Sequence, residues 1–598
     1  MSEMMSNFFH PTIGFLVLIG ALPFLPGKWW KWVLPIPAII AVISVVQMTP
    51  GNYGGLEWMG FQLQLARVDR LSIIFAHVFA IQAVIGFIYA MHVKRKIHHV
   101  AAAMYVGGAF GCVFAGDYLT LFLFWELMSV ASTVLIWLNH RENKKAPGAG
   151  LRYFLIHTLG GLLMLGGMLL RYKALGNWDF VAIDPATAQV YDWLILFGFG
   201  VNAAFIGLHA WLPDAYPEAT IPGAVFMSAF TTKTAVYTLA RAFAGWEFLA
   251  IMGVLMALYG VVYATMENNA RRILSYHIVS QVGYMVAGIG IGTYMTVNGA
   301  AAHAYAHILY KGLLFMSVGA LLHATGTAKL TELGGLVGRL PWVMICYVVA
   351  GLSISGWPVF NGFVSKTMTI AGAFADHRVL LGLGMEVAAV GTFLSVGLKL
   401  PYFAFWGGKP NDMQRKLTPI PWNMYVAMFI GAGLCIAQGV YPQMLYTLLP
   451  YPEAAAEFHP WTPWHVTQAL LLLSFAGLAF YLQRETMKPH RQLNLDFEFF
   501  YRWAGKLFLW VVSYPLAWLD SIWTEVYRWV GLRGLLWSAL GTDVFDRRAI
   551  DGVVDGAAYN TREAGRGTAL AQTGRLNDYF AGAVVVGLIV FVVVWLVG

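Results

Sequence analysis

The chain has 598 residues, of which 59% are hydrophobic and only 11% are charged. Soluble domains carry about 25% charged residues, so this composition excludes a soluble protein. The formal charge of +8 does not indicate nucleic acid binding. The basic residues lie in short loops between apolar stretches, where membrane proteins retain Lys and Arg on the cytoplasmic side. The composition therefore predicts an integral membrane protein that contacts the lipid bilayer.

Apolar stretches long enough to cross a bilayer recur along the chain. In lipid, every backbone polar group must be satisfied within its own segment, so these stretches predict an all-α helical bundle and exclude a barrel. Basic loops after the first, third, fifth, ninth and eleventh spans place the N-terminus outside. The first span lacks signal-peptide features, so we expect it to be retained. We predict sixteen spans, at residues 12–26, 32–48, 71–92, 98–116, 118–138, 153–171, 193–211, 221–243, 246–265, 273–292, 299–323, 341–375, 379–405, 422–448, 464–483 and 580–597.

Prolines and glycines interrupt the predicted helices at two places. HAWLPDAYPEATIPG occupies residues 209–223, and SGWPVFNGFVSK occupies residues 355–366. Interrupted helices are the best sequence indication of a transport site, because their free ends can face a water-filled cavity. Each interruption lies near the fourth span of a five-span block. Because five is odd, the two blocks are predicted to form inverted repeats.

Composition and these repeats divide the chain into six predicted parts. Residues 484–579 mix Trp and Tyr with Arg, Asp and Glu, which is typical of a lateral helix at the membrane interface. A short extra span at residues 507–519 remains an alternative. The parts are N-terminal helices at 1–97, a first half-channel repeat at 98–243, a second at 244–405, additional helices at 406–483, the lateral segment at 484–579 and a final transmembrane helix at 580–598.

Ionisable side chains inside the predicted spans are the strongest functional signal. Each costs at least about 2.5–3.5 kcal/mol at mid-membrane, so it must be paired, hydrated or functional. One structural ion pair would explain Glu126, and satisfied bundle histidines would explain His303 and His307, which share a helix face with Lys311. The whole set exceeds what one pair needs, and desolvation favours neutral forms that exchange protons. We therefore predict an ion relay of Glu126, Lys233, His303, His307, Lys311 and Lys366.

Four other polar residues are weaker candidates, namely Asn202, His209, Glu386 and Lys399. Glu386 and Lys399 lie near opposite ends of the thirteenth span, where their side chains could reach water. His303 and His307 have the spacing of zinc ligands, but no Glu or Cys stands beside them and Lys311 would repel a cation. The three cysteines stand apart, without paired spacing, at Cys112, Cys346 and Cys435. We predict no metal site and no bound cofactor.

Six motifs occur in a characteristic order along spans four to thirteen. They are WELMS around Glu126, HAWLPDA at 209–215, TKTAVY around Lys233, RRILSYHIVSQVGYM at 271–285, HAYAHILYKGLLF at 303–315 and GFVSK at 362–366. Together they resemble the antiporter-like subunits shared by respiratory complex I and Mrp sodium/proton antiporters. VNAAFIGLHAWLPDAYPEA and SAFTTKTAVYTLARAF look most like the D subunit of Mrp antiporters. The long tail looks like the largest antiporter-like subunit of complex I.

The resemblance implies a core of about 14 helices, with two inverted five-helix half-channels and two broken helices along a central hydrophilic axis. The first half-channel would hold Glu126 and Lys233, and Lys366 would end the relay in the second. The residues implied to bridge the two halves are His303, His307 and Lys311.

One position departs from the family pattern. The family usually has a lysine seven residues before His209, and Asn202 stands there. Asparagine can hydrogen-bond water but cannot titrate. Either Glu126 works directly with Lys233, or the first half-channel has lost proton pumping.

These features predict a proton-translocating membrane subunit of a multi-subunit complex, with sodium/proton antiport as a variant. A Rossmann fingerprint, a cysteine cluster and a large soluble domain are all missing from the sequence, so redox chemistry would belong to partner subunits of an NADH-quinone oxidoreductase-like or hydrogenase-like complex. Asn202 leaves open a largely structural or energy-coupling subunit of a redox or inorganic-carbon uptake complex. We expect a multi-pass protein of the bacterial inner membrane, whose partners are other membrane subunits and not nucleic acid.

Overall fold

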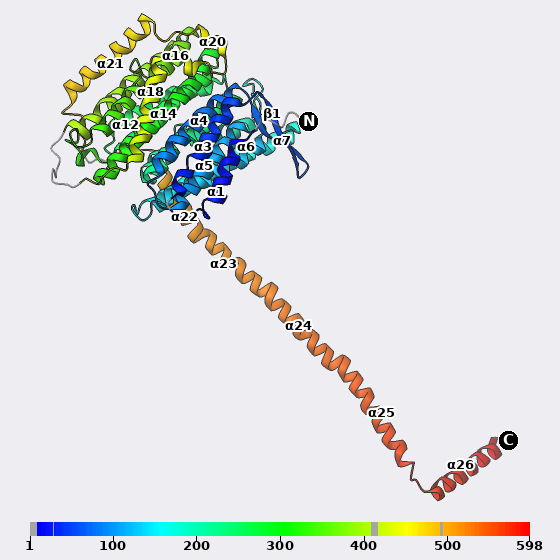
Figure 1. Ribbon diagram of the computed structural model, residues 1–598. Coiled ribbons are helices and arrows are strands. Elements are labelled where there is room, and N and C mark those ends of the chain that lie inside the picture. The colour runs from blue at the N-terminus through cyan, green and yellow to red at the C-terminus, as the bar shows by residue number, and fades with distance from the viewer. Residues whose placement is uncertain (1–8, 28, 408–416, 491–493, 598) are drawn as a thin grey trace. The chain divides into compact units, whose positions relative to one another are not determined.

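A computed structural model describes residues 9–27, 29–407, 417–490 and 494–597. The chain forms two units, residues 1–499 and residues 500–598, which are described separately. Helices of the first unit pack side by side, with α12, α14, α16 and α18 in one part and α1, α3, α4, α5 and α6 in another (Figure 1). Every predicted relay residue lies in this unit.

The first part of this unit contains seven helices and a hairpin. The helices are α1 (Pro11–Ala21), α2 (Trp30–Val33), α3 (Ile36–Gln47), α4 (Arg70–Ala90), α5 (Lys96–Phe114), α6 (Tyr118–Trp137) and α7 (Ala146–Leu175). Apolar side chains dominate them, and the aspartates that precede α4 and α6 accept hydrogen bonds from the free amides of their first turns.

An antiparallel hairpin, β1 (Gly51–Trp58) and β2 (Phe61–Val68), joins α3 to α4, and we did not predict it. Its two-residue turn, Met59 and Gly60, has positive φ at both positions, as a type I′ turn requires. The β2 sequence FQLQLARV alternates apolar and polar residues, which is the sequence signal of a strand. The fold is therefore a helical bundle with one added hairpin.

The first interruption consists of several short elements between two helices. Helix α8 (Val190–Ala203) ends at Ala204, whose left-handed backbone stops the helix. Three short elements follow before α11 (Thr231–Ala242) resumes. They are α9 (Trp211–Ala215), the 3₁₀ turn η1 (Tyr216–Glu218) and α10 (Ile221–Ala229). The predicted span 221–243 is thus divided at Phe230, three residues before Lys233.

The rest of the unit begins with α12 (Glu247–Met266), α13 (Ala270–Ile291) and α14 (Tyr294–Thr325). The second interruption separates α15 (Pro341–Ser355) from α16 (Asn361–Ala375), as the sequence predicts. The remaining elements are η2 (Leu330–Glu332), α17 (Val379–Thr392), the π-helical turns η3 (Phe393–Lys399) and η4 (Tyr402–Trp406), α18 (Trp422–Val440), α19 (Gln443–Tyr446), α20 (Pro452–Glu457) and α21 (Pro463–Gln483).

Helix α14 is the central element of the bundle. It packs against α4, against α10 in the first interruption, and against α13, α15, α16 and α18. Nearly all of its residues are buried, including its histidines at 303 and 307 and Lys311. Because α14 is buried on all sides, the helices at both interruptions, α10 and α16, pack against it.

Among the described residues, eleven helices are long and apolar enough to cross a membrane, and three shorter apolar helices accompany them. The three are α1, α8 and α15, and the latter two are shortened by the interruptions. The predicted helical membrane architecture with two broken helices is confirmed, and the β1–β2 hairpin is an addition to it.

The second unit is almost entirely helical. It runs through most of α22 (Glu498–Val511), η5 (Val512–Leu516), α23 (Ala517–Val526), η6 (Tyr527–Arg533), α24 (Gly534–Phe545), η7 (Asp546–Asp551) and α25 (Gly552–Leu570) as one rod (Figure 1). Residues 507–519 are part of this continuous helix. Helix α26 (Leu576–Val597) is apolar and long enough to cross a bilayer.

Candidate functional site

Each broken helix leaves carbonyl groups without helical partners, and a buried lysine donates to them. Lys233 on α11 donates through Nζ to the carbonyl of Ser228 at 2.8 Å and to Thr232 Oγ1 at 3.0 Å. Lys366 on α16 donates to the carbonyl of Ile354, near the end of α15, at 2.6 Å. The last four carbonyls of a helix are free acceptors, so both lysines are held at helix ends.

Helix α14 presents His303, His307 and Lys311 along one face, all fully buried. His303 Nδ1 lies 3.0 Å from Ser365 Oγ on α16, and the rings of His303 and His307 are 6.3 Å apart. In the described part of the chain, neither His307 nor Lys311 Nζ has a hydrogen-bond partner. The face therefore carries titratable groups that no described residue neutralises.

The two broken regions and the α14 face form one electrostatic cluster. His307 lies close enough to Lys233, Lys311 and Lys366 to interact with the charge of each. Lys311 likewise interacts with the other two lysines. Among the ion pairs of the described residues, none includes these three lysines. Three buried amines without a carboxylate cannot all hold a full positive charge at low cost, so a proton on one disfavours protons on the others.

Glu126 lies apart from this cluster. It is half-buried on α6, and its Oε1 packs so closely against Gly161 of α7 that an added Cβ there would lie 2.1 Å away. Oε1 is buried and has no hydrogen-bond partner among the described residues. The described ion pairs include none between Glu126 and Lys233, so the structure does not bring these two predicted partners into direct contact.

Asn202 is buried near the end of α8, and a histidine that we did not single out accompanies it. His157 on α7 is fully buried and lies within reach of Asn202. Its ring centroid lies 4.1 Å from that of Tyr153, in a tilted arrangement, and 4.5 Å from that of Trp211, in an edge-to-face arrangement. Its sequence signal was the same as for the chosen residues, because it is an ionisable residue inside the predicted span 153–171.

His277 on α13 also belongs to the site. Its Nε2 lies 2.7 Å from Ser395 Oγ, and it is close enough to interact with the charges of Lys311 and Lys366. His277 stands in one of the quoted motifs, RRILSYHIVSQVGYM, and its position inside the predicted span 273–292 is the sequence signal that could have identified it. Through Ser395, it extends the cluster to η3.

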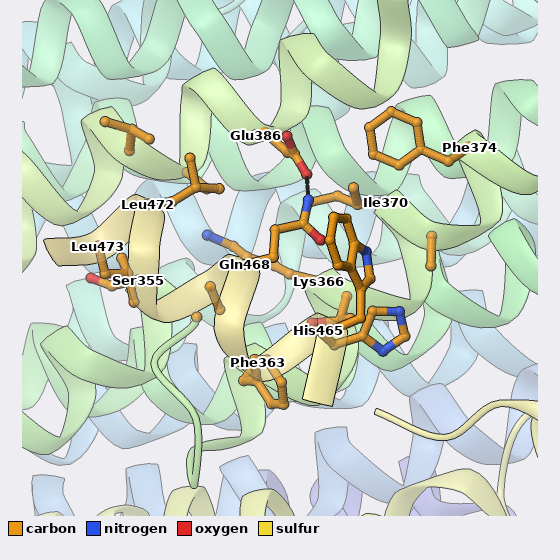
Figure 2. A pocket seen from close by; sticks show the side chains of 17 residues that line it. Ser355, Phe363, Lys366, Ile370, Phe374, Glu386, His465, Gln468, Leu472 and Leu473 are labelled. Atoms are coloured by element: carbon orange, nitrogen blue, oxygen red, sulfur yellow. Dashed lines mark hydrogen bonds between the residues drawn. The ribbon is translucent and has the colours of Figure 1, made fainter. Parts of the chain in front are cut away.

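A cavity of about 290 Å³ adjoins Lys366, between α16, α17 and α21. Figure 2 shows Glu386, His465 and Gln468 at its lining, with a hydrogen bond from the Gln468 amide to the Glu386 carboxylate. Glu386 therefore faces a partly polar cavity. Apolar side chains form much of the remaining wall, among them Phe363, Ile370, Phe374, Leu472 and Leu473.

Lys399 differs from the expectation that it reaches water. It is buried, and its Nζ donates to the carbonyls of Thr265 and, at 3.2 Å, of Glu267. Both carbonyls lie at the C-terminal end of α12, where a cation is favourable. Lys399 thus joins two helices.

His209 lies in the first interruption and is fully buried. Its Nε2 is 3.2 Å from Oδ1 of Asp496, which precedes α22. Burial alone would raise the pKa of Asp496, but hydrogen bonds from His209, Tyr259 and Tyr276 outweigh it and hold that pKa well below its usual range. The predicted lateral segment 484–579 therefore contains a buried carboxylate, ahead of the long helix.

Comparison with known proteins identifies the membrane domain. Residues 115–394 match the family described as NADH:quinone oxidoreductase/Mrp antiporter, TM. The chain is 29% identical to hydrogenase-4 component B of Escherichia coli (strain K12) over 62% of this chain and 61% of that protein. It is 28% identical to the A subunit of the Na(+)/H(+) antiporter of Alkalihalophilus pseudofirmus over 93% and 71%, and 30% identical to the D subunit of the same antiporter over 52% and 66%. The chain thus spans under two thirds of the length of two of these relatives.

Solved structures share the fold. A chain of the Mrp complex from Dietzia sp. DQ12-45-1b superposes with a TM-score of 0.63 at 22% identity, over 77% of this chain and 95% of that one. A chain of the archaeal membrane-bound sulfane sulfur reductase superposes with a TM-score of 0.65 at 22% identity, over 78% and 97%. The family match shows that residues 115–394 of this multi-pass membrane chain form a membrane domain of the NADH:quinone oxidoreductase/Mrp antiporter family, and the solved structures show the same fold.

Proposed function

We propose that this chain is a proton-translocating membrane subunit of a multi-subunit complex. One observation carries the proposal: buried lysines and histidines connect the two broken helices across α14 without a carboxylate to neutralise them among the described residues. A purely structural bundle would gain nothing from such a cluster, because each buried charge is costly unless it is paired. Groups that pass a proton among themselves avoid holding several charges at once.

The relay begins at Lys233 and ends at Lys366. A proton that reaches Lys233 repels protons on His307 and Lys311, and displaces them toward His303 and Lys366. At an effective dielectric constant of about 20, two unit charges 4 Å apart repel by roughly 4 kcal/mol, and the repulsion falls inversely with distance. Neighbours in this cluster therefore exert enough repulsion to drive each transfer. Ser365, whose Oγ lies 3.0 Å from His303 Nδ1, precedes Lys366 in the chain and can hand on a proton through its hydroxyl.

Glu126 influences this path without being a member of it. Because its carboxylate lies against α7 and makes no ion pair with Lys233, its charge acts through space rather than by direct transfer. The partly polar cavity beside Lys366, with Glu386 at its wall, supplies a route between the end of the relay and water. Lys399 holds helices together and takes no part in transfer.

The transported ion is the proton. A cluster of amines and imidazoles repels sodium, which requires several oxygen ligands. Sodium exchange, which the names of the Na(+)/H(+) antiporter relatives suggest, would then take place elsewhere in the complex.

Partners and location follow from the relatives. Solved chains with this fold come from membrane complexes, so we propose other membrane subunits as partners, in the inner membrane of a bacterium. The two halves at residues 98–243 and 244–405 are proposed as half-channels. The alternative, an energy-coupling subunit with an inactive first half-channel, is favoured by Asn202 at the usual lysine position.

The test uses the intact complex in proteoliposomes with a pH-sensitive dye inside. Lys233→Ala and Glu126→Gln are each expected to lower proton flux at least tenfold. Lys329→Ala is the matched control, because Lys329 is exposed and pairs with Glu332 outside the cluster. Flux that is unchanged in both site variants would refute translocation through this chain.

A further inference from the structure

The segment that leads into the long C-terminal helix inserts a carboxylate into the helix bundle. The Asp496 side chain is only 2% exposed, although the residues on both sides of it are partly open to solvent. It contacts α12, α13 and the first broken helix, all within the first unit. Residues 484–579 were expected to lie along the membrane surface, so this insertion is a separate feature of the chain.

Four donors surround the Asp496 carboxylate. Oδ1 accepts from His209 Nε2 at 3.2 Å, from the Tyr259 hydroxyl, and from the backbone amide of Phe497 at 2.6 Å. Oδ2 accepts from the Tyr276 hydroxyl at 2.6 Å. These bonds stabilise the ionised form, so the residue carries a negative charge inside the bundle.

Anchoring alone does not account for this charge. Tyr263 already holds the segment by donating to the carbonyl of Leu495 at 2.8 Å, and Arg272 lies 3.9 Å from Glu498 at the edge. Tyr259 and Tyr263 face the site from α12, and Tyr276 and Arg272 from α13. Among the donors to the carboxylate, His209 is the imidazole, the type of side chain that takes up and releases a proton near neutral pH.

The other nitrogen of His209 gives the second observation. Nδ1 is buried and has no hydrogen-bond partner among the described residues, whereas Nε2 faces Asp496. The ring is held between Tyr259 at 4.8 Å and Phe497 at 5.8 Å. A carboxylate that orients an imidazole through one nitrogen stabilises a proton on the other.

We propose that Asp496 and His209 form a proton-carrying pair, which supplies the first broken helix with the titratable group that Asn202 does not provide. The neutral imidazole keeps its proton on Nε2, directed at Asp496. It takes a second proton at Nδ1 and releases it from the same atom, so the pair returns to its starting state. Asp496 remains ionised and acts as a positioning residue. This inference rests on the proposed proton translocation.

The test compares Asp496→Asn with Glu498→Gln in the intact complex. Asparagine keeps the size and an acceptor oxygen but removes the charge, whereas Glu498 is the neighbouring acid of the same segment. We expect Asp496→Asn to lower proton flux at least tenfold with normal assembly, and Glu498→Gln to change it less than twofold. Wild-type flux and pH profile in Asp496→Asn would overturn the inference.

A rescue variant separates a titratable role from anchoring. Adding Asn202→Lys to Asp496→Asn restores titration on the same broken helix, and we expect it to recover at least half of the lost flux. No recovery would overturn the inference in favour of an anchor. If Asp496→Asn prevents assembly, His209→Gln takes its place, with the same rescue and the same opposing result.

Lys233→Ala, measured in the same experiment, tests the proposed function separately from the inference about the pair. If Lys233→Ala abolishes flux and Asp496→Asn does not, only the inference about the pair fails. If Lys233→Ala leaves flux unchanged, the relay itself fails.

Discussion

Gly362→Ala perturbs the second broken helix at its closest approach. Gly362 lies in the first turn of α16, and a Cβ there would lie 1.7 Å from the carbonyl oxygen of Ser353 on α15. Ordinary van der Waals contact is 3.4–4 Å. Because the obstacle is backbone, the two helix ends must separate by roughly 1.5 Å, and overpacking of this kind costs about 1–3 kcal/mol.

The separation of α15 and α16 also displaces the relay residue Lys366. Lys366 stands four residues after Gly362, on the same face of α16, and donates to Ile354 at 2.6 Å. Moving α16 away by the same amount stretches this bond to about 4 Å, beyond hydrogen-bond range. Losing a hydrogen bond from a charged group costs about 1.5–3 kcal/mol, which is about a tenfold to hundredfold change in a rate that depends on it.

The assay measures both effects on the purified complex. Thermal unfolding is expected at a lower temperature than in wild type, and proton flux in proteoliposomes is expected to fall at least tenfold. Gly433→Ala on α18 is the control, since a Cβ there meets nothing within 4 Å and alanine favours the helix. Wild-type stability and flux in Gly362→Ala would refute the tight crossing of α15 and α16.

Three further predictions concern single side chains. Gly161→Ala places a Cβ against the flexible end of Glu126. Proton flux should therefore fall several-fold, while the unfolding temperature barely changes. Unchanged proton flux would contradict a role for this carboxylate. Ser365→Ala removes the 3.0 Å contact to His303, worth about 1 kcal/mol, and should slow flux about fivefold in the same dye assay, whereas Ser365→Thr should not. Because the pKa of Asp496 is lower in the folded than in the unfolded protein, its ionised carboxylate stabilises the fold at pH values above the unfolded pKa of about 4. This stabilisation is lost as the pH falls toward the folded pKa, so the difference in unfolding temperature between wild type and Asp496→Asn should shrink below about pH 4. A constant difference would contradict an ionised carboxylate.

The sequence was sufficient to place the two broken helices and the helix face that carries His303, His307 and Lys311. The prolines in HAWLPDAYPEATIPG and SGWPVFNGFVSK lack an amide donor and disfavour a helical conformation of the residue before them, so the interruptions are local properties of the chain. The i, i+4, i+8 spacing of His303, His307 and Lys311 likewise defines one face of α14 whatever packs against it.

Tertiary contacts decided what the sequence could not show. Glu126 and Lys233 both lie in the predicted first half-channel, but helix rotation turns Glu126 toward Gly161 on α7, where it makes no ion pair with Lys233. Lys399 looked able to reach water, yet the C-terminal carbonyls of α12 hold it inside. Asp496 contacts His209 across 287 positions of sequence, and no local pattern predicts such a contact.

The most direct measurement of the central claim is proton flux through the intact complex carrying Lys311→Met. Methionine fills the space on α14 without a charge, and Lys329→Met in an exposed loop is the matched control. A proton path that crosses α14 predicts at least a tenfold loss in Lys311→Met and none in the control. Wild-type flux in Lys311→Met, in a normally assembled complex, would contradict a path through these buried groups.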